Sequence, residues 1–226
     1  MQDVITVHHL NNSRSQRVLW LLEELGLPYE LVKYERDPKT MLAPKSLEAI
    51  HPLGKSPVIT DDGKTIAESG AILEYLVDTY GKGRLIPATG TQAHIDYRYF
   101  LHYAEGSLMP YLLLKLIFRR IKTAPMPFFV KPIAKGIAGK VSSQFVDPNL
   151  VRHLTFLNNH LAKHEWFAGD SLTAADIQMS FPVESAVARG GDLADVSQLA
   201  AWVNKIKARP AFAKAIESGG PYDLLG

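Results

Sequence analysis

The chain of 226 residues contains no cysteine. This absence excludes disulfides, thiolate metal sites, a cysteine nucleophile and any dithiol redox cycle of the protein itself. It also excludes thiol transfer through a mixed disulfide with the protein. Any thiol chemistry at this protein therefore needs a thiol that a bound molecule supplies.

Long hydrophobic runs are missing as well. Nowhere do about 18 uncharged apolar residues follow one another, as a membrane-spanning helix requires. The first residues, MQDVITVHHLNN, lack the basic stretch and apolar run of a secretory signal. The sequence therefore predicts a cytoplasmic protein.

An excess of charge of one sign is absent too. Lys and Arg total 25 and Asp and Glu total 23, which gives a formal net charge of +2. Because proteins that bind nucleic acid usually carry far more positive charge, we expect no nucleic-acid partner. The hydrophobic fraction of 46% predicts a packed core in one large domain or two small ones.

Strand-like and helix-like segments alternate over residues 1–81. Strands are predicted at 4–10, 29–32, 57–60 and 65–67, and helices at 14–25, 43–50 and 69–80. The turn Asp61-Asp62-Gly63 makes the last two strands a hairpin. This order predicts an α/β domain with a partly parallel sheet.

A different organisation is predicted after a linker at 82–90 that is rich in Gly and Pro. Apolar helical faces are predicted at 94–120, 149–164, 173–188 and 196–208, and no strand pattern remains. The sequence therefore predicts an all-helical domain over 91–226. Within it, Thr173 and Asp176 have the spacing of a capping box.

Basic residues gather in the segment 115–140, which contains no acid. They are interleaved with apolar residues and are Lys115, Arg119, Arg120, Lys122, Lys131, Lys135 and Lys140. Such a segment can make a peripheral contact with an anionic membrane. A solvated face is the commoner explanation, so we treat membrane contact as the less favoured interpretation.

Pro57 stands directly before a predicted strand, in the string HPLGKSP. A proline there normally removes a donor that strand pairing needs, which a cis Ser56-Pro57 bond would resolve. The cis bend would turn the backbone of Ser56 outward to bind an extended peptide as an added strand. An ordinary loop proline is the alternative, since only about 5% of such bonds are cis.

Glu68 and Ser69 stand where a strand meets the start of a helix. The helix N-terminus and the Ser69 hydroxyl can receive a carboxylate, and Glu68 suits an ammonium group. Together the two residues match the α-amino-acid end of a ligand. A plain helix cap at Ser69 and a solvated Glu68 are the alternatives.

The string NNSRSQR, at 11–17, links the first strand to the first helix. A hydroxyl at this helix N-terminus can donate to a thiolate, so Ser13 is a candidate for lowering the pKa of a bound thiol. A helix-capping role is the alternative for Ser13. His8 and His9 fall on opposite faces of a strand and therefore predict neither a zinc pair nor a shared base.

Taken together, these features resemble the cytosolic glutathione transferases. The strings SRSQRVLWLLEELGLPYE, HPLGKSPVI, AESGAILEYL, YAEGSLMP and LTAADIQMSFP look most like a branch shared by bacteria and fungi, which includes the yeast microsome-associated enzymes. The resemblance covers nearly the whole chain. It implies a thioredoxin-like N-terminal domain, an all-α C-terminal domain and a homodimer.

The resemblance also implies a binding site for glutathione. In it, Glu68 and Ser69 hold the γ-glutamyl end, and the backbone of Ser56, beside Pro57, pairs with the cysteinyl unit. Lys55 and Lys39 hold the glycine carboxylate. A further implied ligand contact is His51, which stands where many relatives have Asn.

For the catalytic position, the resemblance implies Ser13 as the hydroxyl that activates the thiol. Arg14 and Ser15 are rival candidates, as is Asn11, near which the tyrosine classes place their Tyr. No metal or redox cofactor is implied. Glutathione would be a co-substrate.

The activity implied is attack of the glutathione thiolate on hydrophobic electrophiles, with glutathione-dependent peroxide reduction as an extension. The candidate walls of the electrophile pocket, for which a core position is an equal alternative, are Tyr103, Leu108, Met109, Tyr111 and Leu112. Two other functions stay open. One is a non-catalytic regulatory protein that binds glutathione, and the other is a dedicated glutathione-dependent isomerase or dehalogenase.

Overall fold

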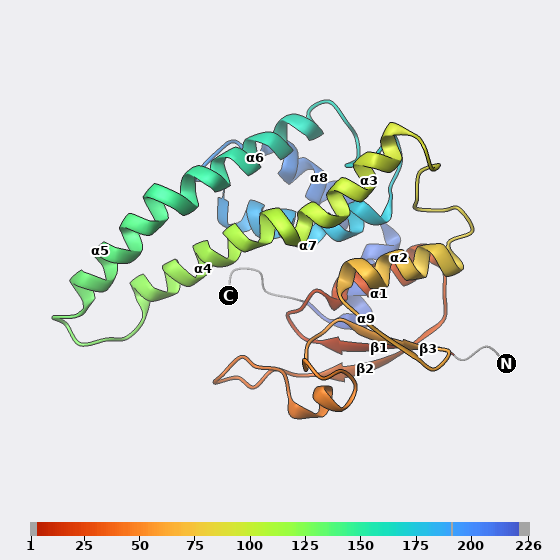
Figure 1. Cartoon of the computed structure of the whole chain (residues 1–226), viewed down its shortest axis with the longest axis horizontal. Helices are drawn as coiled ribbons and strands as arrows, with labels where there is room; N and C mark the ends of the chain where they lie inside the picture. Colours follow the sequence, from red (N-terminus) through yellow and green to blue (C-terminus); the bar gives the residue numbers. More distant parts are fainter. Residues whose placement is uncertain (1–3, 191, 222–226) are drawn as a thin grey trace.

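The structure is a computed structural model that describes residues 4–190 and 192–221. A sheet with helices comes first along the chain, and an all-helical part follows (Figure 1). The elements of the first part are β1 (Ile5–Leu10), α1 (Ser15–Leu25), β2 (Tyr29–Tyr34), η1 (Lys45–Ala49), β3 (Val58–Asp61), β4 (Lys64–Ala67) and α2 (Ser69–Tyr80). Those of the second are α3 (Gln92–Tyr103), η2 (Ala104–Leu108), α4 (Met109–Thr123), α5 (Lys131–Val141), η3 (Ser142–Val146), α6 (Asp147–Leu161), α7 (Ala174–Gly190), α8 (Ser197–Lys207) and α9 (Pro210–Gly219).

The sheet has four strands in the order β2-β1-β3-β4. β1 pairs with β2 in parallel and with β3 antiparallel, and β3 and β4 are antiparallel. Asp62 and Gly63 both have positive φ, 48° and 72°, as a tight hairpin turn requires. The prediction of a mixed, thioredoxin-like sheet is therefore confirmed, and after Ala67 the described residues form no further strand.

The helix predicted at 43–50 is a five-residue 3-10 helix, η1. The amide of Leu47 donates to the Pro44 carbonyl at 3.0 Å, and the amide of Ile50 to the Leu47 carbonyl at 3.1 Å. Pro44 and Pro52 flank this segment. Because proline has no backbone N–H to donate, neither residue can contribute to a longer run of helical hydrogen bonds. The short interval between the two prolines therefore holds a 3-10 helix.

The single helix predicted at 94–120 is interrupted by the π-helical turn η2. There the amide of Met109 donates to the Ala104 carbonyl. Pro110 follows at once, and η3 likewise precedes Pro148. A widened turn relieves the clash between a proline ring and the carbonyl four residues earlier, so both proline positions are tolerated.

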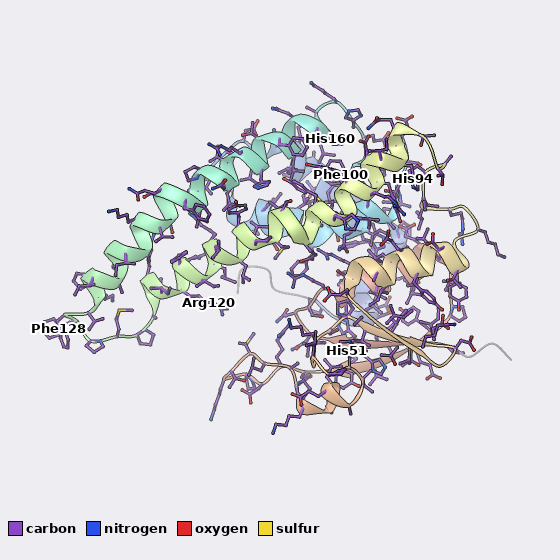
Figure 2. The ribbon with its side chains drawn as sticks, viewed as in Figure 1. His51, His94, Phe100, Arg120, Phe128 and His160 are labelled. Carbon is purple, nitrogen blue, oxygen red and sulfur yellow. The ribbon has the colours of Figure 1, made fainter. Side chains whose placement is uncertain are left out.

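Two helices were not predicted from the sequence, α5 and α9. α5 pairs with α4 in a hairpin that projects from the body of the molecule (Figure 1). Phe128, which is 86% exposed, lies at its tip, far from His51 in the N-terminal part (Figure 2). Within the described ranges, no helix combines the length and the apolar character needed to cross a membrane.

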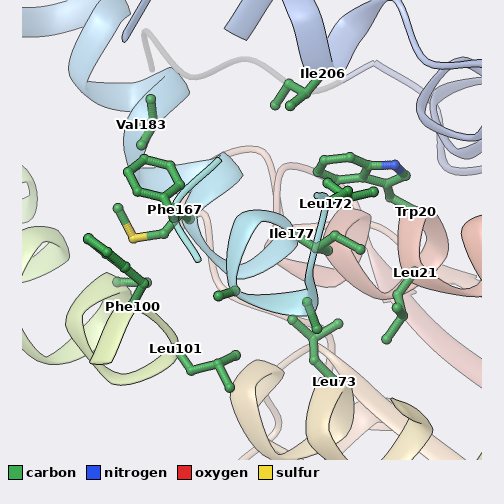
Figure 3. Close-up of a cluster of buried hydrophobic side chains, with 14 of the residues drawn as sticks. Trp20, Leu21, Leu73, Phe100, Leu101, Phe167, Leu172, Ile177, Val183 and Ile206 are labelled. Atoms are coloured by element: carbon green, nitrogen blue, oxygen red, sulfur yellow. The ribbon is translucent and has the colours of Figure 1, made fainter. Parts of the chain in front are cut away.

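One hydrophobic core joins the two parts of the chain. Figure 3 shows Leu73 of α2, Leu101 of α3 and Ile177 of α7 in one cluster of buried side chains. Trp20 of α1 packs in the same cluster with 1% exposure. The shared core fixes the helical part relative to α1 and α2.

The last helix, α9, returns to the N-terminal part and packs on α1. Phe212 meets Trp20 edge to face, with ring centroids 5.1 Å apart. The Arg209 guanidinium donates to both carboxylate oxygens of Glu24, at 2.6 and 2.9 Å. The C-terminal segment therefore supports the helix that follows the loop 11–14.

The capping box at the start of α7 is built around the Asp176 carboxylate, which is fully buried. It accepts the Thr173 amide at 2.9 Å, the Thr173 hydroxyl at 2.9 Å and the Phe167 amide at 2.8 Å. The acidic half of the predicted box is confirmed, but the Thr173 hydroxyl donates to Asp176 instead of capping an amide. Burial raises the pKa of Asp176 to about 6.

We predict that Thr173→Ala lowers the free energy of unfolding by about 1.5–3 kcal/mol, because it removes a hydrogen bond to a buried carboxylate. Urea denaturation at pH 7 measures the change. Thr173→Ser keeps the hydroxyl and should stay near the wild type. Equal stability of Thr173→Ala and wild type would contradict this interpretation of the box.

Candidate functional site

A cavity of about 250 Å³ lies where the N-terminal part meets η2. The side chains that line it come from the loop before β3, from the start of α2, from the residue before α1 and from η2. They are Arg14, His51, Leu53, Lys55, Ser56, Pro57, Ala67, Glu68, Ser69 and Glu105. His51 lies in the N-terminal part (Figure 2).

Most of the binding residues expected from the sequence meet at this cavity. Those that line it are Arg14, His51, Lys55, Ser56, Pro57, Glu68 and Ser69. Four of the residues expected to bind or activate glutathione are not among the lining side chains: Asn11, Ser13, Ser15 and Lys39. Lys39 is exposed on the loop after β2, outside the cavity.

The turn before β3 has the predicted cis Ser56-Pro57 bond. The Ser56 hydroxyl donates to the His8 carbonyl at 2.8 Å and accepts the Leu10 amide at 3.2 Å. These bonds tie the turn to β1. Pairing of β3 with β1 begins at Val58, so the backbone of Ser56 lies outside the sheet ladder and beside the cavity.

Glu68 has a backbone conformation that side-chain-bearing residues rarely adopt, with φ 71° and ψ 121°. Such a conformation costs of order 1–3 kcal/mol and is concentrated at ligand sites. It brings the exposed Glu68 side chain and the buried Ser69 to the cavity at the N-terminus of α2. Glu68 occupies the cap position and no side chain caps the helix, so the plain-cap explanation of Ser69 is wrong.

The Ser69 hydroxyl instead accepts a hydrogen bond from Arg17, a residue of α1 that is 1% exposed. The same Arg17 nitrogen, Nη1, donates to Glu105 at 2.7 Å and to Gln178 at 3.2 Å. Arg14 also donates to Glu105, at 2.8 Å. One buried guanidinium thus joins α1, α2, η2 and α7.

The two arginines share a second support, the ring of Phe181 on α7. The guanidinium carbons of Arg14 and Arg17 lie 5.2 and 5.4 Å from its centroid, within the range of cation–π attraction. Burial raises the pKa of Glu105, but the Arg17 and Arg14 guanidiniums outweigh it and hold the pKa below its ordinary value. Glu105 is therefore ionised at neutral pH.

Sequence reasoning missed Arg17, Glu105 and Gln178. A signal for Arg17 was present, because it is four residues before Leu21 on the apolar face of α1. A charged residue on an apolar helix face needs a buried partner. Which residue is that partner could not be predicted from the sequence, because Glu105 lies in the other domain and meets Arg17 only in the folded protein.

The loop between β1 and α1 places Ser13 inside the protein, 5% exposed. Its hydroxyl oxygen accepts the Ser15 amide at 3.2 Å and lies 2.7 Å from the Ser15 hydroxyl oxygen. The cap position of α1 is Arg14, without a side-chain cap. Asn11 accepts the Arg36 amide at 2.9 Å and so fixes the chain after β2.

The expected walls of an electrophile pocket separate into two groups. Four of them are buried in the hydrophobic core, which is the alternative that the sequence left open: Tyr103, Leu108, Met109 and Leu112. Tyr111 lines a second cavity of about 450 Å³ with Phe145 and His153. The first four side chains face the core because α3, η2 and α4, which carry them, all pack against α7.

Comparison with known proteins agrees with this geometry. Residues 13–79 match the family profile "Glutathione S-transferase, N-terminal domain", and residues 124–210 match "Glutathione S-transferase, C-terminal domain". The chain is 36% identical over 215 residues to glutathione S-transferase 3 of Schizosaccharomyces pombe, which covers 95% of this chain and 87% of the relative. It is 33% identical over 222 residues to glutathione S-transferase 1 of Saccharomyces cerevisiae, with 95% and 94% covered.

Solved structures show the same architecture. A glutathione S-transferase from Actinobacillus pleuropneumoniae is 31% identical, with a TM-score of 0.76 and coverage of 98% of this chain and 95% of the other. A sphingomonad glutathione S-transferase, solved in complex with glutathione, shares the fold at 23% identity, with a TM-score of 0.70 and coverage of 95% and 98%.

A thioredoxin-like sheet, a helical domain and a cavity between them define the class of two-domain, thioredoxin-fold transferases. Within that class, the matches over both domains are specific. The chain belongs to the glutathione S-transferase family.

We predict that Glu105→Gln lowers the free energy of unfolding by about 1.5–3 kcal/mol at pH 7, because charged hydrogen bonds to two arginines are lost. A carboxyl whose pKa is lowered by folding stabilises the protein above its unfolded pKa and loses this effect as the pH falls through its folded pKa. The difference between variant and wild type should therefore shrink below about pH 4.5.

Urea denaturation at several pH values measures this difference. Glu165→Gln is the matched control, since the Glu165 side chain is 66% exposed and pairs with Lys205 at the surface. A surface pair contributes little, so the control should stay near the wild type. A difference that is independent of pH would contradict the role given to the Glu105 charge.

Proposed function

We propose that the first cavity binds glutathione and that the protein transfers it, as a thiolate, to hydrophobic electrophiles. The observation that carries the proposal is the convergence of two separate features on one cavity. The outward turn at Ser56-Pro57 lies on one side, and Glu68 with Ser69 at the N-terminus of α2 lies on another.

The γ-glutamyl end of glutathione is assigned to the start of α2. A guanidinium can only donate, so the Ser69 oxygen accepts from Arg17 and its hydroxyl hydrogen can serve the ligand's α-carboxylate. The positive end of the helix favours the same carboxylate. Glu68, exposed at the cavity, pairs with the α-ammonium.

The remainder of the tripeptide is assigned to the loop before β3. The backbone of Ser56, outside the sheet ladder, receives the cysteinyl unit as a short added strand. Lys55 and His51, which line the cavity, meet the glycine carboxylate. Lys39 has weaker support, because it does not line the cavity.

Activation of the thiol is assigned to Ser13. A free thiol has a pKa of about 8.5, and lowering it by two units requires about 2.7 kcal/mol. A hydrogen bond to a charged group contributes about 1.5–3 kcal/mol, and a helix N-terminus about 0.3–1 kcal/mol. Ser13 before α1 can therefore supply the shift. Like Lys39, Ser13 does not line the cavity, whereas its neighbour Arg14 does and adds positive charge.

The thiolate then attacks the electrophile, and of the expected wall residues only Tyr111 stays in the proposal. The same thiolate can attack a peroxide oxygen, which breaks the O–O bond, releases the alcohol and forms a glutathione sulfenic acid. A second glutathione converts this sulfenic acid to glutathione disulfide and water. That second thiol is necessary, since the chain contains no cysteine to resolve the intermediate.

Binding is tested with Ser69→Ala and Glu68→Gln. Each removes one ligand contact at the γ-glutamyl end, so we predict that each weakens glutathione binding about 10–100-fold, measured by isothermal titration calorimetry. Asp62→Asn, an exposed change in the β-hairpin turn, is the control and should bind as the wild type does. Unchanged affinity in both site variants would refute the assigned orientation.

Catalysis is tested with Ser13→Ala and 1-chloro-2,4-dinitrobenzene as the electrophile. Loss of a two-unit pKa depression, from about 6.5 back to about 8.5, reduces the thiolate fraction, so kcat/KM at pH 6.5 should fall about 50-fold. Glutathione affinity should change little. Full activity of Ser13→Ala with loss in Arg14→Met would move thiol activation to Arg14. Tight binding without any transfer by the wild type would instead favour a non-catalytic glutathione-binding protein.

A further inference from the structure

A buried chain of hydrogen bonds connects Ser13 to a histidine that the function described above does not use. The Ser13 and Ser15 hydroxyl oxygens are 2.7 Å apart, and the Ser15 hydroxyl oxygen is 2.8 Å from Nδ1 of His9. Exposure is 5% for Ser13, 0% for Ser15 and 4% for His9. The three side chains therefore form one continuous path shielded from water.

The far end of this path is closed by α9. The backbone of Gly219 lies beside the His9 ring, since a Cβ built on Gly219 would be 3.1 Å from Cε1, and it raises the pKa of His9 as a carbonyl acceptor does. A Cβ placed on Gly219 would lie 2.5 Å from Oε1 of Gln16 and 2.7 Å from Cδ1 of Leu19. Only glycine allows the end of α9 to approach His9 this closely.

The place of the Gly219 backbone beside the ring assigns a direction to the hydrogen-bond path. A carbonyl only accepts, so the His9 nitrogen next to it carries the hydrogen, and in the neutral ring Nδ1 accepts. The Ser15 hydroxyl then donates to Nδ1 at 2.8 Å in preference to the Leu10 carbonyl at 3.4 Å, and the Ser13 hydroxyl donates to Ser15. In this state Ser13 offers its lone pairs, not its hydrogen, to a bound thiol.

His9 is neutral in this state. Burial lowers its pKa, and Lys33, its register partner on β2, lowers it further, against the effect of Gly219. Lys33 is the charged group that acts on the ring, whereas Ser15 and Gln16 of α1 and Gly219 of α9 contribute dipoles. A negative charge that forms on a ligand beside Ser13 would raise the pKa of His9.

We propose that His9 and Ser15 are positioning residues that take up the thiol proton of bound glutathione through Ser13. The inference rests on the proposed function, because it requires glutathione to place its thiol beside Ser13. The sulfur gives its proton to Ser13, Ser13 gives its own to Ser15, and Ser15 gives its own to Nδ1 of His9. One proton leaves the sulfur and one arrives at the imidazole.

The transfer leaves every group with a partner. Both His9 nitrogens then donate, one to Gly219 and one to Ser15, and the Ser15 hydroxyl donates to Ser13. The Ser13 hydroxyl is released to donate to the thiolate. The hydrogen-bond path from Ser13 to His9 thus supplies both the acceptor for the proton, His9, and the donor that stabilises the thiolate, Ser13.

The first test uses the wild-type protein with ¹⁵N-labelled histidine at pH 7. We expect glutathione to convert Nδ1 of His9 from an unprotonated to a protonated nitrogen in the NMR spectrum. S-methylglutathione has no thiol proton and should leave Nδ1 unprotonated. The His9 signal is identified from the contact of its Cε1 proton with Gly219, since a Cβ on that residue would lie 3.1 Å from Cε1. A neutral His9 beside an ionised glutathione thiol would overturn the proposal.

The second test compares variants by ultraviolet absorbance of the bound thiolate across pH. His9→Asn keeps an acceptor for Ser15 but cannot take a proton, and Ser15→Ala breaks the chain. Each should raise the pKa of the bound thiol by at least about one unit, which lowers the thiolate fraction at pH 6.5 about fivefold. Affinity for S-methylglutathione should stay within about twofold, and KM for glutathione should change less than kcat.

His8→Asn is the matched control, because His8 points to the other face of β1 and bonds Tyr34. It should leave the thiol pKa unchanged. If Ser13→Ala raises the thiol pKa while His9→Asn and Ser15→Ala do not, the proton path is wrong and the proposed function remains. If the wild type binds no glutathione, the proposed function itself fails.

Discussion

The buried guanidinium of Arg17 is the group on which the geometry of the cavity depends. An isolated charge inside a protein is very costly, and it is tolerated only when it is paired and hydrogen-bonded. Glu105 supplies the opposite charge from η2, while Ser69 and Gln178 accept further bonds from α2 and α7. Because these partners come from both domains, the start of α2 is held in one position relative to the helical domain, and with it the residues assigned to the γ-glutamyl end.

α1 therefore takes part in two separate groups of polar contacts, one made by Arg17 and the other by Ser15. Arg17 faces the charged contacts of α2, η2 and α7, whereas Ser15, two residues earlier, faces His9 on β1. α9 packs on the same helix and closes the path at His9. Family membership explains the shared architecture, while the path from Ser13 to His9 is argued from the contacts of this chain alone.

Much of the fold follows from local signals in the sequence. Strand alternation, the Asp62-Gly63 turn and the helical spacing of 14–25 all predict elements that the structure contains. The sequence left a cis bond and an ordinary loop proline open at Pro57, and the structure has the cis bond. The side of a helix that faces the core could not be predicted, since Leu108 of η2 and Leu112 of α4 become core residues only when both elements pack against α7. The partners of Arg17 and His9 come from distant parts of the chain, so no local pattern reveals them.

The central claim is that the first cavity recognises glutathione by its γ-glutamyl end at α2. A calorimetric titration with glutathione, S-methylglutathione and cysteinylglycine tests it most directly. The account predicts similar affinity for the first two ligands, because the thiol is not the anchor. Cysteinylglycine, which lacks the γ-glutamyl group, should bind at least about 100-fold more weakly. Equal affinity for cysteinylglycine and glutathione would contradict the account.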